Sequence, residues 1–114
     1  MRQVLQIDPE FKRLSVPFSV EEERRLEKSL MREGCKDPIV VWNGYILDGH
    51  KRYEVCSYEE IEYETIRMDF ATREEAIIWV CKKRMETLTP DDVMYKYLGG
   101  RRYACEKIRA QAIR

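Results

Sequence analysis

The sequence is poor in the residues that build metal sites and disulfide frameworks. Its 114 residues include one histidine, and the four cysteines lie more than twenty positions apart with no C-x-x-C pair. Zinc ligands usually come in closely spaced pairs, so this spacing argues against a zinc site. A chain of this length buries enough apolar surface to fold without disulfides. We therefore expect no resident metal, and cysteines that are buried thiols in a reducing compartment.

Long apolar runs are also missing. No segment approaches the roughly 18 apolar residues that a membrane-spanning helix needs, and the first residues do not resemble a signal peptide. Hydrophobic residues nevertheless make up 44% of the chain and aromatic residues 11%, which excludes wholesale disorder. We therefore expect a single domain over residues 1–114 that is cytoplasmic and has no membrane partner.

Net charge is absent as well, because 21 basic residues balance 21 acidic ones. The two signs are unevenly distributed. Residues 1–81 contain 12 basic and 17 acidic side chains, whereas residues 82–114 contain 9 and 4. A basic C-terminal part on an acidic body favours nucleic acid as a partner, although solvated helices show the same bias. The DNA-binding candidates are Lys82, Lys83, Arg84, Arg101 and Arg102.

Capping and turn signals predict the first half of the fold. Pro9 and Pro17 favour an extended start over residues 6–16. Ser19 and Glu22 form a capping box that opens a helix over 20–33. Asn43-Gly44 between two β-rich runs predicts a hairpin, because both turn positions need positive φ. A short helix over 50–56 and a strand over 61–68 follow.

The second half of the chain is predicted to be helical. We expect helices over about 73–84, 90–98 and 101–113, the second beginning at Thr89 and ending at Gly99-Gly100. Ala104, Ile108 and Ala112 lie along one stripe of the last helix. The predicted class is therefore α+β, with a small mixed β-sheet and hairpin in a core over 11–80 and a basic helical part over 81–114.

The chemistry is concentrated where the second hairpin strand meets the following helix. We expect Asp48 to cap that helix and Gly49 to make the turn. The amides of Gly49, His50 and Lys51 would then point out of the helix end, where the macrodipole favours an anion. Lys51 and Arg52 add two positive charges. The pattern predicts a site for a nucleotide, a DNA phosphate or a phosphorylated metabolite, although a capped, solvated helix start has the same residues.

These motifs resemble the N-terminal domain of ParB-like proteins, also called the ParB-like nuclease domain, which shares a fold with sulfiredoxin. The resemblance rests on Gly34, residues 37–42 (DPIVVW), Asn43-Gly44, residues 46–53 (ILDGHKRY), residues 73–76 (REEA) and residues 88–92 (LTPDD). Residues 97–103 (YLGGRRY) look like the tail of a branch carried by phages and mobile elements. The likeness covers most of the chain, from about Phe11 to Tyr103.

The resemblance implies two kinds of function for the same motif. In partition ParB proteins the matching motif binds the triphosphate of CTP, and the domain clamps DNA as a dimer. Gly49, Lys51 and Arg52 would then contact phosphate, with His50 where a glutamate is usual. Free-serine kinases carry an Asp-Gly-His-basic-Arg motif close to residues 48–52, which makes Asp48 and His50 catalytic candidates and an acid within 21–27 a candidate base. Sulfiredoxin has its nucleophilic cysteine at the position of His50, so that chemistry is not expected.

One segment departs from the family pattern. Residues 81–87 read CKKRMET, without the carboxylate and amide that help hold metal and triphosphate in ParB proteins. This weakens the prediction of triphosphate hydrolysis. Cutting of DNA is not expected either, because Asp48, Asp91 and Asp92 look like helix-start acids rather than a metal-binding cluster.

Two hypotheses therefore go forward, with a third kept open. The first is a homodimeric ParB-like module that binds DNA, nucleotide (CTP or ATP, with or without Mg²⁺) or both, in partition or transcriptional control of a mobile element. The alternative is a nucleotide-dependent phosphotransferase that uses the same motif. The third is a protein-interaction domain whose helical half docks a partner.

Overall fold

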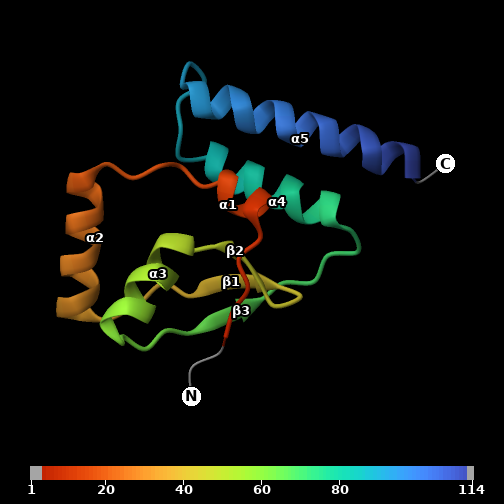
Figure 1. Ribbon diagram of the computed structural model, residues 1–114. Coiled ribbons are helices and arrows are strands. Elements are labelled where there is room, and N and C mark those ends of the chain that lie inside the picture. Colours follow the sequence, from red (N-terminus) through yellow and green to blue (C-terminus); the bar gives the residue numbers. More distant parts are fainter. Residues whose placement is uncertain (1–3, 113–114) are drawn as a thin grey trace.

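A computed structural model describes residues 4–112 as a three-stranded mixed sheet with helices on both faces (Figure 1). The elements are α1 (Pro9–Arg13), α2 (Val20–Glu33), β1 (Ile39–Trp42), β2 (Tyr45–Asp48), α3 (His50–Glu59), β3 (Thr65–Arg67), α4 (Arg73–Met85) and α5 (Val93–Ala112). The strand order is β2-β1-β3, with β2 antiparallel and β3 parallel to β1. The α+β prediction is confirmed. Within the described span, every helix is too short or too polar to traverse a bilayer.

The hairpin and the helix before it form as their local signals predict. Ser19 and Glu22 exchange both hydrogen bonds of the capping box, and α2 ends at Gly34. Asn43 and Gly44 have φ values of 50° and 82°, the left-handed pair that a tight hairpin turn requires. A register shift beside Val40 places this residue opposite Asp48. The strand β2 ends at Asp48.

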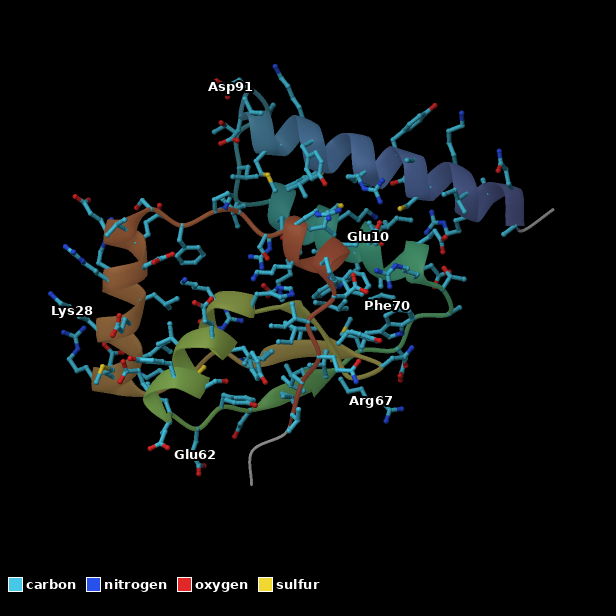
Figure 2. The ribbon with its side chains drawn as sticks, in the orientation of Figure 1. Glu10, Lys28, Glu62, Arg67, Phe70 and Asp91 are labelled. Atoms are coloured by element: carbon cyan, nitrogen blue, oxygen red, sulfur yellow. The ribbon has the colours of Figure 1, made fainter. Side chains whose placement is uncertain are left out.

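The extended start predicted for residues 6–16 is wrong at residues 9–13, which form α1. Pro9 occupies the first turn of α1, where its missing N–H breaks no helical bond. Asp8 caps this helix by accepting a hydrogen bond from the Glu10 amide at 2.9 Å. A proline just after an aspartate thus begins a helix here rather than preventing one. Glu10 lies where α1 meets α4 and α5 (Figure 2).

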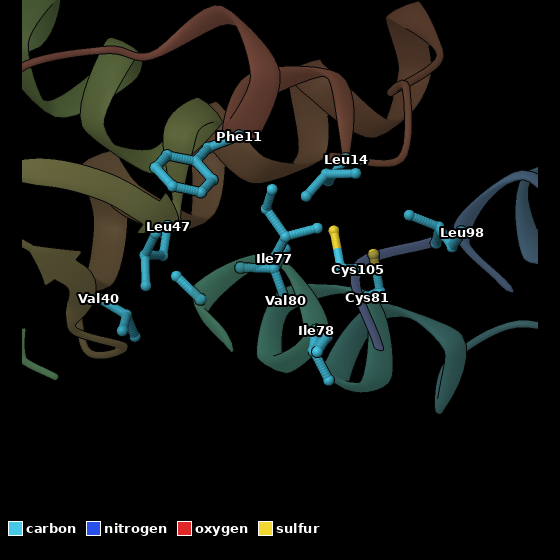
Figure 3. Close-up of a cluster of buried hydrophobic side chains, with 11 residues drawn as sticks. Phe11, Leu14, Val40, Leu47, Ile77, Ile78, Val80, Cys81, Leu98 and Cys105 are labelled. Atoms are coloured by element: carbon cyan, nitrogen blue, oxygen red, sulfur yellow. The ribbon is translucent and has the colours of Figure 1, made fainter. Parts of the chain in front are cut away.

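The main core lies between the sheet, α1, α4 and α5 (Figure 3). Its members include Phe11 and Leu14 beside α1, Val40 and Leu47 from the sheet, Ile77, Val80 and Cys81 from α4, and Leu98 and Cys105 from α5. A smaller cluster of Leu5, Ile39, Val41 and Ile46 lies on the other sheet face, with Tyr53 of α3 packed against it. Successive strand residues point to opposite faces, which explains how Val40 and Val41 enter different clusters.

The C-terminal part forms two helices rather than the three predicted. A single helix, α5, continues through Gly99-Gly100, and Asp92 rather than Thr89 caps it by accepting from the Met94 amide at 2.8 Å. A glycine pair inside a helix costs about 1 kcal/mol per residue. Leu98 and Cys105, buried against α4 on either side of the pair, offset that cost.

Packing also gives two other elements different lengths. Ala104, Ile108 and Ala112 lie along one stripe of α5, and this stripe is exposed. The helix α3 is longer than predicted, and β3 is only three residues long. None of the four cysteines is in a disulfide; Cys56, Cys81 and Cys105 are buried and Cys35 is half-buried, against the prediction that all four are buried.

Candidate anion-binding site

The corner between β2 and α3 depends on a glycine. Gly49 is the N-cap of α3 with φ of +101°, a conformation that side chains disfavour. A Cβ there would lie 2.9 Å from Arg52 Nη2 and 3.3 Å from Ile39 Cγ1. The prediction that Asp48 caps the helix is wrong, because α3 has no side-chain cap and Asp48 belongs to β2. The amides of the first turn therefore have no side-chain acceptor.

A cavity of about 380 Å³ opens at this corner. Its volume lies within the range of small-molecule sites. Three stretches that are distant in sequence form its walls: the stretch from α1 into α2, the start of α3, and the end of α4. The lining is Lys12, Ser15, Val16, Pro17, Phe18, Glu23, Leu26, Gly49, His50, Lys51, Arg52, Glu54 and Arg84. The wall is thus apolar beside residues 16–18 and charged beside α3.

Asp48 organises the cations of the corner. Its carboxylate is buried, with 7% of the residue exposed, and accepts a hydrogen bond from the Arg84 guanidinium. Lys83 Nζ lies 3.7 Å and Arg52 Nη2 lies 4.0 Å from the other carboxylate oxygen. Arg52 also donates to the Pro38 carbonyl at 3.0 Å. One carboxylate therefore fixes three cationic side chains, which suits a positioning role better than a catalytic one.

Lys51 is held by carboxylates of α2 and α3. Its Nζ lies 3.0 Å from Glu23 of α2 and 3.4 Å from Glu54 of α3. The hydrogen bond to Glu23 is the main reason that the pKa of Lys51 is raised, so the ammonium stays charged. The corner as a whole gathers five cationic side chains, Lys12, Lys51, Arg52, Lys83 and Arg84, around the carboxylates of Glu23, Asp48 and Glu54. Positive charge is in excess.

His50, which lines this cavity, carries an unpaired polar atom. The residue is 7% exposed, its Nδ1 lies 3.3 Å from Ser15 Oγ, and its buried Nε2 has no hydrogen-bond partner. The pKa of His50 is lowered to about 4, mainly by burial. The charges of Arg84 and Lys12 also lower it, whereas the charge of Asp48 raises it. The imidazole is therefore neutral at pH 7. Because buried polar atoms are normally paired, the bare Nε2 points to a ligand at this position.

The structure brings together only part of the predicted site. Gly49, His50, Lys51 and Arg52 lie in one cavity, and Arg84 joins them from α4 with Lys83 close behind. The other DNA-binding candidates lie elsewhere: Lys82 is exposed on α4, Arg101 pairs with Glu10 at 2.7 Å and Arg102 pairs with Glu106 at 2.6 Å. The five candidates therefore do not form one surface.

Sequence reasoning missed several residues of this cavity. Lys12 and Ser15 fall in the stretch that was expected to be extended, and they reach the corner only because α1 turns the chain there. The apolar wall at residues 16–18 carries no motif. Glu23 lies among the acids at 21–27 that were considered as a base, and the capping box that fixes the start of α2 is the signal that could have singled it out.

Metal binding at this corner stays a prediction. Among residues 4–112, no three carboxylate, imidazole or thiol groups gather as a metal-ligand set. A magnesium ion that arrives with a nucleotide needs only one or two protein carboxylates. The carboxylates of the corner are those of Glu23, Asp48 and Glu54, and each of them already contacts a cationic side chain.

Comparison of the chain with known protein families, curated proteins and solved structures gives no match. The resemblance to ParB-like proteins therefore still depends on the motifs alone.

Proposed function

We propose that this chain binds a phosphorylated ligand, with a nucleotide as the first candidate, in the cavity at the start of α3. The observation that carries the proposal is the unpaired, buried Nε2 of His50, a residue that lines the cavity beside the uncapped first turn of α3. A helix start and an excess of cations are separately common on protein surfaces. Their convergence on one cavity with a bare buried donor or acceptor favours a bound anion.

The lining divides in a way that suits a phosphate ester. The first-turn amides, Arg84 and Lys12 offer donors and positive charge for phosphate oxygens. The wall of Val16, Pro17, Phe18 and Leu26 offers apolar surface for the organic part of the ligand, such as a nucleobase. A neutral His50 can donate one hydrogen bond to phosphate without adding charge.

The resemblance to ParB-like proteins supplies the wider proposal. On that basis the nucleotide is CTP or ATP, and the chain acts as a homodimer on DNA in partition or transcriptional control of a mobile element. The DNA part has less support, because Arg101 and Arg102 are each paired with a glutamate. Lys82 and Lys83, which are exposed at the end of α4, remain the better candidates for contacts with the DNA backbone, whereas Arg84 is bonded to Asp48.

A phosphotransferase is the alternative, and the presence of His50 and Glu23 in one cavity favours it over other enzymes. The carboxylate of Asp48 is held by Arg84 and is not available as a base. His50 is a weak base, because its pKa is lowered to about 4. Consumption of ATP or ADP in the presence of a small hydroxyl compound would favour the phosphotransferase. Binding of the nucleotide without turnover would favour the binding module.

Calorimetric titration with phosphate, pyrophosphate and the common nucleoside triphosphates, with and without Mg²⁺, tests the proposal. We expect saturable binding that weakens with salt and is tightest for a nucleotide. Arg101→Gln is the matched control, because it removes a paired cation outside the cavity. The proposal is wrong if no phosphate compound binds at low ionic strength, or if Arg84→Gln binds as tightly as the wild type. Retention on labelled duplex DNA, measured in parallel, tests the DNA part.

A further inference from the structure

The helix α2, which contributes to the cavity wall, is weakly anchored to the core. Of its fourteen residues only Leu30 is buried, and Leu30 belongs to neither core cluster. The helix packs against α3 at one side of the molecule, and segments without helix or strand join it to the rest at both ends (Figure 1). Its other face carries exposed side chains such as Lys28, which points away from the protein (Figure 2). Few contacts therefore oppose a movement of α2.

One ion pair ties α2 to the charged part of the cavity. Glu23 Oε1 lies 3.0 Å from Lys51 Nζ, and both residues line the cavity. The Lys51 side chain is 25% exposed and that of Glu23 is 44% exposed. Glu54 approaches the same ammonium from α3 itself, so of the two contacts only the one to Glu23 crosses between helices. A phosphate in the cavity would meet an ammonium that already has a carboxylate partner.

We propose that Glu23 is a built-in competitor of the anion and sets its affinity. In the free protein the Glu23 carboxylate pairs with the Lys51 ammonium. An incoming phosphate displaces Glu23 from Lys51 and so releases α2 from α3. The inference rests on the proposed function and adds its regulation. By linkage, whatever holds Glu23 on Lys51 weakens anion binding, and a bound anion loosens α2 by the same factor.

The Glu23–Lys51 ion pair is weak enough for a phosphate to displace Glu23. Ion pairs that are partly exposed contribute little and are screened by salt. A phosphate ester carries more charge than one carboxylate and offers more acceptor oxygens. The opposite arrangement, in which Glu23 aids binding by orienting Lys51, predicts the opposite effect of removing its charge. The two arrangements therefore separate in one experiment.

The test compares Glu23→Gln with Glu21→Gln in the whole chain, using pyrophosphate as the probe. Both variants remove one charge from the first turn of α2, but Glu21 does not line the cavity. We expect Glu23→Gln to bind pyrophosphate about threefold to fivefold more tightly at low salt, and Glu21→Gln to change by less than twofold. Unchanged or weaker binding by Glu23→Gln overturns the inference.

Hydrogen exchange gives a second readout, on the wild type and then on Glu23→Gln. Saturation with pyrophosphate should speed amide exchange in α2, whereas α4 should be unaffected. In Glu23→Gln, α2 should exchange faster before any ligand is added and change little afterwards. Equal or slower exchange of α2 in the saturated wild type overturns the inference while leaving the proposed function in place. If no variant binds pyrophosphate or any nucleotide, the proposed function itself is wrong, and the inference is overturned with it.

Discussion

Two charge clusters of this chain use the same kinds of side chain and differ in their balance. Beside α1, Arg73 pairs with Asp8 at 2.6 Å and with Glu10 at 2.7 Å, and Arg101 pairs with Glu10 at 2.7 Å. Two cations thus meet two carboxylates. At the start of α3, five cations accompany three carboxylates, and all of these groups except Lys83 and Asp48 line a cavity.

The comparison shows that an excess of positive charge, rather than the number of basic residues, distinguishes a candidate anion site from a cluster of ion pairs that only connects helices. The balanced cluster connects α1 with α4 and α5 and has no charge left for a ligand. Beside the unbalanced cluster, burial lowers the pKa of His50, the charges of Arg84 and Lys12 lower it further, and Nε2 has no hydrogen-bond partner. Arg101 and Arg84 are both arginines of the basic C-terminal part, yet their surroundings suggest different roles.

The largest expected effect is that of Gly49→Ala. The variant forces a side chain into a left-handed conformation and against Arg52, so we expect a loss of about 2 kcal/mol or more in the free energy of unfolding, and no measurable anion binding. Urea unfolding and calorimetry measure the two effects. Gly44→Ala is the control, because Gly44 has φ of +82° but open space around it. If both variants keep full binding, the close approach at Gly49 does not shape the site.

Arg84→Gln should weaken anion binding roughly tenfold to hundredfold, because hydrogen bonds between charged groups are among the strongest. It also leaves Asp48 with only Lys83 and Arg52 nearby. Pyrophosphate affinity by calorimetry is the measurement. Equal losses for Arg84→Gln and Arg101→Gln would remove the distinction between the two clusters.

Acid should destabilise the protein through His50. The pKa of His50 in the folded state is about 4, below its ordinary value of 6.5, so the unfolded chain binds more protons. Stability is therefore lost as the pH falls from 6.5 towards 4, and between pH 7 and 5 the loss from this residue is about 2 kcal/mol. The urea midpoint should fall less between pH 7 and pH 5 in His50→Asn than in the wild type. Equal falls in the two proteins would contradict the assigned environment of His50.

The smallest expected effect concerns the balanced cluster. Arg101→Gln should lower the free energy of unfolding by about 1 kcal/mol or less, because both partners are about one-third exposed and water screens the pair. Anion affinity should stay within twofold of the wild type. Thermal unfolding and calorimetry on the same preparation give both values. A marked loss of affinity would mean that the two clusters act together.

Local signals predicted much of the fold. The capping box at Ser19 and the Asn43-Gly44 turn need only neighbouring residues, and both formed as predicted. The start of α1 and the unbroken α5 were missed, because the local sequence allows two structures at each place. Pro9 can begin a helix or prevent one, and Gly99-Gly100 can end a helix or lie inside one. Contacts with distant helices select between them.

The candidate site was predicted at its centre and missed at its edges. The corner at Gly49 was visible in the sequence, because one short motif contains the strand end, the turn and the helix start. The partner of Asp48 was not, because Arg84 lies 36 residues further along the chain. Lys12, Ser15 and Glu23 likewise come from other elements. Charge balance in space cannot be read from a sequence in which opposite charges are equal in number.

The most direct test of the account is an NMR titration of the ¹⁵N-labelled chain with pyrophosphate. If an anion binds at the start of α3, the amide signals of Gly49, His50 and Lys51 should shift in a saturable way, and those of α5 should stay in place. Shifts spread along α5 with none at these three amides would contradict the account.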